Sequence, residues 1–429
     1  MARNNSVSKF IHPMIYAKMT RGTKETLEVI VHSNSTCEHI RDQITNVGGK
    51  IKYELPFIGA FAVELPTNAV AQVAQHHRVE YIHDDAKVFK SMDIATKVVG
   101  SVMVNETGYT GKGIGVAVLD TGVYPHEDLV RPTNRIVAFR DFINDRSRPY
   151  DDDGHGTHVA GIIAGSGYVN SKYKGIAPEA NIIGVKVLDE TGSGNTSDIL
   201  AGIQWIVDNK EKYNIKVMSM SLGSAADTPA SQDSLSKGVA SAVQHGITVV
   251  VSAGNSGPTR QSITSPGIAP SAITVGAVDD NRTASIGDDF IADFSSRGPT
   301  IDGLSKPDVV APGVDIHSLS NKGPGAYVSH SGTSMAAPIV AGAAALLYEK
   351  EPNLTPGQAK TRILNSGVAI DRNRYSQGSG LINIRKILQI ENQAMPESET
   401  DVPQGRRPFR YPRRSGFNPT WLMMLLFFI

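Results

Sequence analysis

The amino-acid sequence predicts an α/β protein in which a large parallel-sheet domain follows a small α+β domain. Two patterns predict this division. Residues 27–85 alternate between strand and helix patterns in the order β-α-β-β-α-β. From Gly113 onward, apolar β-branched runs alternate with helical stretches. At 429 residues, the chain is also longer than one hydrophobic core usually supports, so two domains are expected.

The composition narrows the classes of function. Because 42 basic residues balance 42 acidic ones, no net charge favours nucleic acid as a partner. Cys37 is the single cysteine, so no internal disulfide can form, which suits a reducing compartment. The first residues lack the apolar run of a secretory signal, and no segment has the roughly 17–25 apolar residues of a membrane span. We therefore expect a cytoplasmic protein.

The small domain is expected to follow an N-terminal extension, residues 1–26, and to occupy residues 27–95. Its predicted elements are a strand at 27–33, a helix at 37–48, two strands within 50–66 that meet near Gly59, a helix at 67–77 and a strand at 79–85. This order is typical of a ferredoxin-like sandwich. Many functions use that fold, so the order alone predicts none of them.

The large domain is expected at residues 96–391, and its βα units begin at Gly113, after a mixed connector at 86–110. Apolar runs that read as strands buried on both faces lie at 113–120, 181–188, 216–222, 246–254 and 271–278. Segments whose apolar residues have helical spacing lie between or after these runs, at 155–165, 197–212, 234–246 and 334–350. Repeated βα units of this kind build a parallel sheet, and ligands bind beyond the carboxyl ends of its strands.

Two residues that could carry chemistry lie where a buried strand or an apolar helix meets a turn. Asp120 ends the run GVAVLD, and His155 stands between two glycines just before an apolar helical run. Taken singly, an aspartate in this place more often caps a turn, and one histidine of twelve is more often structural. Together they could supply a base and the carboxylate that orients it.

Ser334 and Asn255 complete a candidate constellation. Thr333 is expected to cap the helix that follows, which leaves Ser334 in the first turn, where free N–H groups favour a nearby anion. Asn255 ends another strand run, and its amide could donate a second hydrogen bond to an oxyanion, although an asparagine here is usually a turn former. Nucleophile, base, carboxylate and donor would then share one edge of one sheet.

Four segments, in chain order, resemble the hallmark motifs of the subtilisin-like serine peptidases, the subtilases, of the cytoplasmic bacterial type. They are VLDTGV, DGHGTHVAG, SAGN and SGTSMAAP, within a resemblance that spans roughly residues 110–390. The resemblance implies a three-layer α/β catalytic domain and a serine endopeptidase that needs no cofactor. It implies that Asp120 orients His155, that His155 takes the proton of Ser334 as it attacks the scissile carbonyl, and that Asn255 steadies the oxyanion.

The resemblance also implies a substrate groove between two chain segments, Gly192-Ser193-Gly194 and Ser221-Leu222-Gly223. Main-chain pairing of that kind accepts many sequences, so broad specificity is expected. Ala253 and Gly254 would line the pocket for the P1 side chain, and because their motif has no carboxylate, we expect an apolar P1 preference. Asp153 would favour a basic residue at P2.

Subtilases commonly carry a ferredoxin-like inhibitory propeptide, and residues 27–95 resemble one. We expect the peptidase to cut itself between Asp84 and Thr96; a permanently attached regulatory domain is the alternative. The loop at residues 164–178 holds no acidic residue before Glu179, although many secreted subtilases bind calcium in this region. We therefore expect no metal ligands there, and the sequence does not locate a calcium site elsewhere.

The C-terminal tail, residues 392–429, lacks periodicity. Nine apolar residues begin at Trp421. Five arginines precede them: Arg406, Arg407, Arg410, Arg413 and Arg414. Basic residues beside a short apolar segment favour an anionic membrane surface, so peripheral membrane contact is one interpretation and an end without a role is the other.

Several other functions fit less well. A zinc peptidase would need the spacing H-E-x-x-H, whereas His155 and His158 are separated by Gly and Thr. The run GKGIG at 111–115 precedes its strand, the wrong order for a dinucleotide site. A furin-like processing peptidase would carry acidic residues at the P1 pocket and a following β domain. A catalytically inactive scaffold with this fold stays the main alternative, although it usually lacks at least one catalytic residue.

Overall fold

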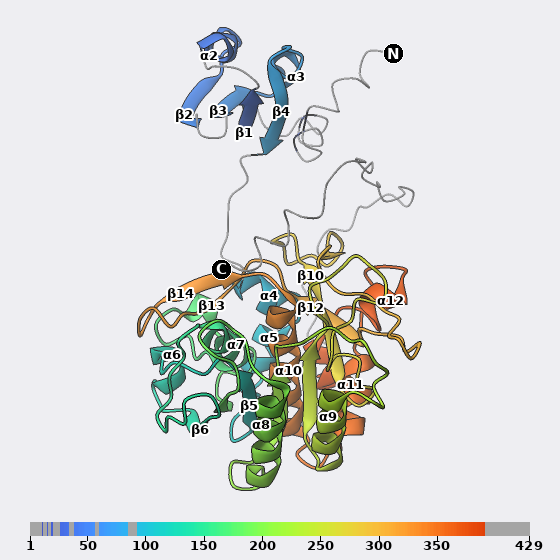
Figure 1. Ribbon diagram of the computed structural model, residues 1–429. Coiled ribbons are helices and arrows are strands. Elements are labelled where there is room, and N and C mark those ends of the chain that lie inside the picture. Colours follow the sequence, from blue (N-terminus) through green and yellow to red (C-terminus); the bar gives the residue numbers. More distant parts are fainter. Residues whose placement is uncertain are drawn as a thin grey trace.

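The computed structural model describes residues 26–33, 38–55, 60–84 and 92–390, together with the single positions Ile11, Ile15 and Met19. These residues form a small N-terminal unit and a larger domain (Figure 1). The predicted turn near Gly59, most of the extension at 1–26 and the tail at 392–429 lie outside the described residues. No helix within the described part of the chain is long and apolar enough to cross a membrane.

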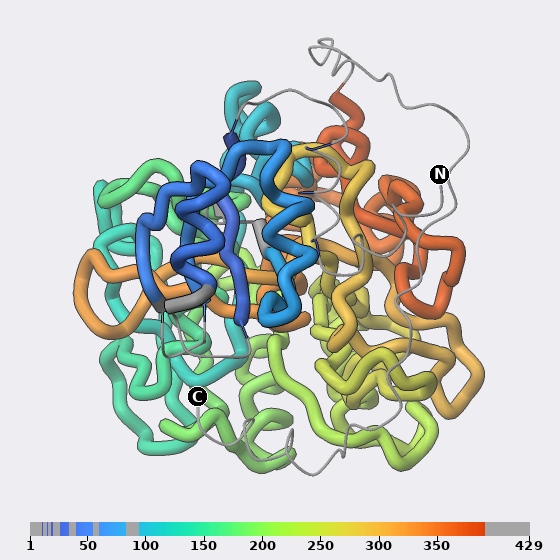
Figure 2. Tube along the Cα trace, turned by 90° about the horizontal axis from the view of Figure 1, so that it is seen from above, coloured from blue at the N-terminus to red at the C-terminus, as the bar shows by residue number. Residues whose placement is uncertain are grey.

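The N-terminal unit has the predicted order of elements. Its strands are β1 (Thr26–Ser33), β2 (Lys50–Leu55), β3 (Ala60–Pro66) and β4 (Val79–Asp84), and its helices are α2 (Glu38–Asn46) and α3 (Val70–Ala74). The antiparallel sheet has the order β2-β3-β1-β4. Figure 2 shows this part of the chain in blue as a compact unit.

Strand alternation places one face of this sheet against its helices. In β1, the buried residues Leu27, Val29 and Val31 alternate with more exposed ones. They pack with Ile40 and Ile44 of α2 and with Val70 and Val73 of α3 in a core that belongs to this unit alone. A strand buried on one face has this period of two. The N-terminal unit therefore has its own hydrophobic core.

The large domain is built on an eight-stranded sheet. Its strands are β5 (Gly115–Asp120), β6 (Ile136–Asp141), β7 (Asn181–Lys186), β8 (Ile215–Met220), β9 (Thr248–Ser252), β10 (Ile273–Asp279), β11 (Phe290–Ile291) and β12 (Val309–Pro312). The order is β11-β10-β9-β8-β5-β7-β6, and β12 pairs with β10. Every pairing is parallel except that of β11 with β10. The predicted parallel sheet is confirmed, and β6, β11 and β12 are strands that the sequence pattern did not reveal.

Helices cover both faces of this sheet and make three layers. One face packs against α7 (His155–Ala164) and α10 (Thr333–Lys350), and the other against α8 (Thr196–Asn209) and α9 (Ser234–Gln244), which lie side by side in Figure 1. Along β5, Val116 and Val118 point to the first face, and Ala117 and Leu119 point to the second. Burial on both faces explains why the strands are continuous apolar runs.

Shorter elements close the domain. They are α4 (Met92–Val98), α5 (Ser101–Glu106), α6 (Glu127–Val130), the 3₁₀ turn η3 (Ser171–Tyr173), the hairpin β13 (Ile316–Leu319) and β14 (Tyr327–His330), α11 (Pro356–Leu364), α12 (Arg374–Gln377) and α13 (Ile384–Ile387). The connector expected at 86–110 thus contains two helices. The predicted boundary between residues 95 and 96 falls inside α4, whose Ala95 is fully buried in the core of the large domain.

Helix α10 runs through the core and depends on small residues. Almost all of its residues from Thr333 to Tyr348 are buried. A Cβ on Gly342 would stand 2.6 Å from Ile176 Cβ, which is itself fully buried and has no free space to move into. Close packing of this kind makes an added methyl group costly.

We predict that Gly342→Ala lowers the free energy of unfolding by about 1–3 kcal/mol, because the new methyl group overlaps Ile176. Gly357→Ala in α11 is the matched control, since a Cβ there meets nothing within 4 Å. A helical Gly→Ala change without a clash stabilises by up to about 1 kcal/mol. Denaturant unfolding followed by circular dichroism measures the free energy of unfolding of each variant. Equal changes in the two variants would contradict the packing argument.

Candidate active site

The candidate residues meet at the edge of the sheet where the parallel strands end. Asp120 is the last residue of β5, Ser221 directly follows β8, and Asn255 lies three residues after β9. Two helices begin at the same edge, so that His155 is the first residue of α7 and Ser334 the second residue of α10. Strand ends and helix starts gather there because each βα unit has the same direction.

Asp120 and His155 are joined by a short hydrogen bond. His155 Nδ1 donates to Asp120 Oδ1 over 2.7 Å, and the Thr121 N–H donates to the same oxygen over 2.8 Å. Asp120 is completely buried, whereas the His155 side chain is 29% exposed. Because a carboxylate can only accept, the proton sits on Nδ1, and Nε2 of the neutral ring is left to accept another.

The charge of this carboxylate governs the protonation of His155. Burial works against the imidazolium, but the Asp120 charge and hydrogen bond, aided by Asp153 and Asp151, outweigh it and raise the pKa of His155 to about 9. The ring is therefore a stronger base than a free imidazole. It takes up a proton readily from a neighbouring hydroxyl group.

The acidic segment before His155 fixes the start of α7. Asp151 accepts from the Gly154 N–H at 2.8 Å, from the Thr157 N–H at 2.9 Å and from the Thr157 hydroxyl at 2.6 Å. Asp153 accepts from the His155 N–H at 2.9 Å. Carboxylates that accept from the first N–H groups of a helix stabilise its N-terminus.

Lys186 ties this segment to two strand ends, a role that the sequence analysis missed. Its completely buried ammonium donates to Asp152 at 2.6 Å and to the carbonyls of Thr121 and Leu188, each at 2.7 Å. A lysine within a strand run buried on both faces was the available signal, since such a charge requires partners. In the parallel register Lys186 lies opposite Asp120.

Ser334 and Ser221 exchange hydrogen bonds, and Pro338 explains one of them. Pro338 lies inside α10 and has no N–H for the carbonyl four residues earlier, which is that of Ser334. The Ser221 hydroxyl donates to this carbonyl at 2.9 Å, and the Ser334 hydroxyl donates to the Ser221 carbonyl at 3.3 Å. The proline therefore leaves an acceptor that attaches the Ser334 turn to the end of β8.

Asn255 is oriented by Thr333. Its Oδ1 accepts from the Thr333 N–H and from the Thr333 hydroxyl, both at 2.9 Å, and the Gly254 N–H donates to that hydroxyl at 3.1 Å. The predicted helix cap is therefore corrected, because Gly332 is the N-cap residue and the Thr333 side chain bonds Asn255 instead. With its oxygen engaged, the Asn255 amide turns its NH₂ group away from Thr333. That nitrogen lies 3.3 Å from the place of a Cβ on Gly332.

The Ser334 hydroxyl is not hydrogen-bonded to His155 among the described residues; it donates to Ser221 instead. In a free enzyme such a bond is often long and forms only with substrate.

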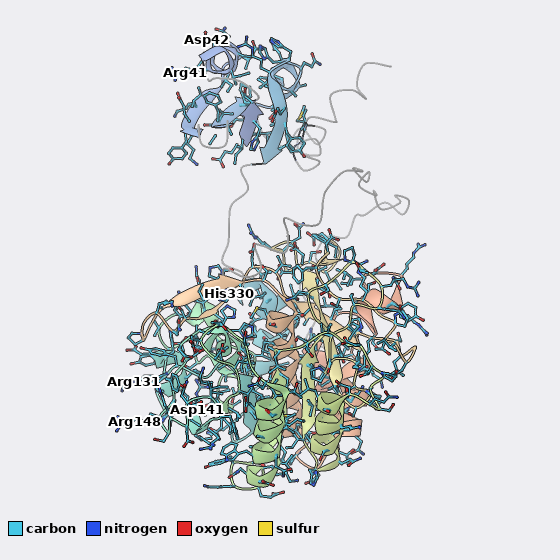
Figure 3. All side chains as sticks on the ribbon, viewed as in Figure 1. Arg41, Asp42, Arg131, Asp141, Arg148 and His330 are labelled. Carbon is cyan, nitrogen blue, oxygen red and sulfur yellow. The ribbon has the colours of Figure 1, made fainter. Side chains whose placement is uncertain are left out.

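Two further histidines lie near His155. His330, labelled in Figure 3, is the last residue of β14, and its ring centroid is 4.7 Å from that of His158. Burial, followed by the charge of His155, lowers the pKa of His330. His158 is structural, because its Nε2 donates to the Ile316 carbonyl at 3.0 Å.

A cleft of about 490 Å³ opens beside His155. Both predicted segments, Gly192-Ser193-Gly194 and Ser221-Leu222-Gly223, line it together with Asp153. Four apolar side chains from the core on the α8 and α9 face of the sheet also line it, and three of them were not predicted from the sequence: Leu188, Ile199 and Leu235, beside Leu222. Leu222 belongs to a predicted segment, but its partners come from a strand end and two helices, so only the fold brings the four together.

Ala253 and Gly254, the predicted P1 residues, are not among those that line this cleft. Ala253 is completely buried in a small apolar cluster with Ala230, Ile263 and Ile268. Gly254 has φ of 101°, and a Cβ there would stand 2.7 Å from Thr264 Cγ2. Their assignment to substrate binding stays a prediction.

The loop at 164–178, where calcium was not expected, makes its own contacts. The buried Asp128 accepts from the Val169 N–H at 2.8 Å and from the Tyr327 hydroxyl at 2.9 Å. Glu179 accepts from the Thr110 hydroxyl. These carboxylates therefore have protein partners.

We predict that Asp120→Asn lowers the pKa of His155 well below about 9, because burial is then opposed only by the weaker charges of Asp153 and Asp151. Histidine-selective NMR titration measures it, with His155→Gln to assign the resonance. Asp208→Asn, an exposed change on α8, is the control and should leave the titration where it was. An unchanged His155 midpoint in Asp120→Asn would show that the carboxylate does not set the basicity of the ring.

Comparison with known proteins agrees with this geometry. Residues 111–381 match the model of the Subtilase family, Peptidase_S8. The chain is 40% identical over 404 residues to serine protease AprX of Bacillus subtilis (strain 168), which covers 87% of this chain and 90% of that protein. Subtilisin E of the same strain is 34% identical over 376 residues, covering 86% and 89%.

Solved structures show the same likeness. The S41 psychrophilic protease is 34% identical with a TM-score of 0.56, covering 64% of this chain and 92% of that one. A cold-adapted subtilisin-like serine proteinase is 35% identical with a TM-score of 0.51, covering 64% and 88%. The family match extends over more than half of the chain and includes every predicted catalytic residue. The chain therefore belongs to the subtilase family and is a serine endopeptidase.

Proposed function

We propose that this endopeptidase cleaves polypeptides through an acyl-enzyme on Ser334, with His155 as the general base and Asp120 as its orienting carboxylate. The observation that carries the proposal is the 2.7 Å bond between His155 and the buried Asp120, which leaves Nε2 of the imidazole as the acceptor. Ser334 lies at the start of α10 at the same edge of the sheet.

In the first step, the Ser334 hydroxyl leaves the Ser221 carbonyl and turns to His155. Its oxygen attacks the scissile carbonyl carbon as its proton moves to Nε2, and the imidazolium is stabilised by Asp120. The carbonyl oxygen, now negative, accepts hydrogen bonds from the Asn255 NH₂ and the backbone N–H of Ser334. The imidazolium then gives its proton to the leaving amine, and water, activated in the same way, releases the acyl group from Ser334.

Thr333 supports the oxyanion donor by holding the other end of the same amide. Because both Thr333 bonds go to Asn255 Oδ1, the NH₂ group is already oriented before substrate arrives. A donor held in this way needs no reorganisation during the reaction.

Broad specificity is proposed because the cleft is bordered by two main-chain segments that can pair with an extended peptide. The first of these segments packs closely against the chain that follows β7, and only glycine fits there, since a Cβ on Gly194 would stand 2.2 Å from the Val187 carbonyl oxygen. The apolar wall of Leu188, Ile199, Leu222 and Leu235 favours an apolar substrate side chain. An apolar preference at P1 is proposed separately, on the absence of a carboxylate at Ala253 and Gly254.

The N-terminal unit is proposed to be an inhibitory propeptide that the enzyme removes itself. It has a hydrophobic core of its own, separate from the cores of the large domain. Since α4 begins at Met92 and buries Ala95 in the large domain, the part of the predicted cleavage range before residue 92 fits best. Cytoplasmic location and membrane contact through the tail stay predictions.

We predict that a fluorophosphonate probe labels the wild type but not Ser334→Ala, and that only the wild type loses its N-terminal residues on incubation. Intact mass measures both outcomes. A folded wild type that takes up no probe would contradict catalysis by Ser334. Labelling without N-terminal loss would leave the enzyme in place and contradict the removable propeptide.

We predict that Asp153→Asn changes two properties of the enzyme. His155 acts as a base in its neutral form, so kcat/KM of the wild type should rise with pH toward the His155 pKa of about 9. Asp153 helps raise that pKa, so in the variant kcat/KM should rise over a lower pH range. Because Asp153 also lines the cleft, the variant should lose its preference for basic P2 residues.

A pH series on one peptide and a P2 library at fixed pH test the two effects independently, with Asp208→Asn as the control for an equal loss of charge. A P2 profile identical to that of the wild type would rule out Asp153 as a specificity residue. A pH profile that does not move would show that its charge does not reach His155.

A further inference from the structure

Two buried carboxylates lie directly beyond the paired residues of β10 and β11. The antiparallel register pairs Val278 with Ile291 and Asp279 with Phe290, and the same register continued by one step would place Asp280 opposite Asp289. Burial follows the same alternation, since Val278 and Ile291 are buried while Phe290 is exposed. Asp280 and Asp289 are again buried, with 1% and 8% of their surface exposed. Of the charges that act on Asp289, that of Asp280 is the largest, as expected for two neighbouring carboxylates.

Three of the four carboxylate oxygens in this pair have no partner among the described residues. Asp280 Oδ1 accepts from the Arg282 N–H at 3.0 Å, but Asp280 Oδ2 and both oxygens of Asp289 accept no hydrogen bond. A buried charged group without a partner costs several kcal/mol. An unpartnered set of oxygens in a well-packed domain therefore indicates a ligand that supplies positive charge.

The neighbouring side chains offer these oxygens no direct partner. Asp279 and Asp288 flank the pair and add negative charge. The charge of Arg282 acts on Asp280 and lowers its pKa, but the guanidinium is bound to Asp315. Asp288 is exposed and already accepts from the Thr283 hydroxyl at 2.8 Å and from the Asn281 amide at 3.2 Å. Burial first, and then the charges of Asp280, Asp288 and Asp279, raise the pKa of Asp289 to about 7; burial raises that of Asp280 to about 6.

We infer that Asp280 and Asp289 form a calcium site in the turn between β10 and β11. Calcium takes six to eight oxygen ligands in a flexible arrangement, and carboxylates are its usual protein ligands. No three acidic, histidine or cysteine side chains in the described part of the chain group together as a metal site. The ion would therefore complete its shell with backbone carbonyls and water, which makes a site of modest affinity.

The site is connected to the start of α10 by the backbone. The Gly313 N–H donates to the Val278 carbonyl at 2.9 Å, and the Gly332 N–H donates to the Gly313 carbonyl at 2.8 Å. Gly332 is the N-cap residue of α10, two positions before Ser334. Calcium would thus stabilise a turn whose strand supports the nucleophile helix. The site is distinct from the loop at 164–178, whose nearby carboxylates have protein partners.

The test uses the full chain carrying Ser334→Ala, treated with a chelator and titrated with Ca²⁺ at pH 8, where both carboxylates are ionised. Calorimetric titration gives the Kd, and thermal unfolding gives the shift in Tm. Asp289→Asn and Asp280→Asn remove one charge each with little change in shape, and Asp288→Asn removes the same charge from the exposed neighbour.

We expect Ca²⁺ to raise the Tm of the parent and of Asp288→Asn, and to bind Asp289→Asn and Asp280→Asn at least about tenfold more weakly. Equal binding by Asp289→Asn would place the calcium elsewhere and overturn the assignment. No binding by the parent would also overturn it. In that case, a Tm that falls from about pH 5 to 7 in the parent and stays level over that range in Asp289→Asn would assign the pair a shared proton instead of a metal ion, because a carboxyl group protonated only in the folded state loses its stabilising effect as the pH rises toward its folded pKa of about 7.

Discussion

The parallel direction of the central strands is the constraint on which the active site depends. β5, β8 and β9 all end at the same edge of the sheet, and this brings Asp120, Ser221 and Asn255 together from distant parts of the sequence. The helices α7 and α10 begin at that edge and pack on one face of the sheet. A sheet with alternating strand directions would divide these residues between its two edges.

Buried polar contacts convert this shared location into fixed geometry. Lys186 joins two strand ends to the acidic segment before α7. Thr333 donates to the amide oxygen of Asn255, and the Ser221 hydroxyl donates to the Ser334 carbonyl, which Pro338 leaves without a helical partner. Each contact satisfies a group that would be costly to bury alone. The same bonds that stabilise the loops therefore fix the start of α7, the turn that carries Ser334 and the amide of Asn255.

The unsatisfied carboxylates stand out against this background. Elsewhere in the large domain, the buried acidic residues Asp128 and Asp151 have partners on both oxygens. Asp120 Oδ2 is unpartnered beside its histidine, and Asp280 with Asp289 leaves three oxygens unpartnered. The first belongs to catalysis, where a charge must stay available to the imidazolium. The second has no catalytic use, and a bound cation would account for it.

The sequence by itself determined the order of elements in the N-terminal unit, five of the eight strands of the large sheet, and the four motif residues Asp120, His155, Asn255 and Ser334. Those features depend on local periodicity and on residue types at fixed spacing. Only the tertiary structure decided the role of Thr333, the partners of Lys186, the apolar wall of the cleft and the proximity of Asp280 to Asp289. Each of these joins residues from separate elements, and a contact of that kind depends on strand register and packing, which no local pattern records.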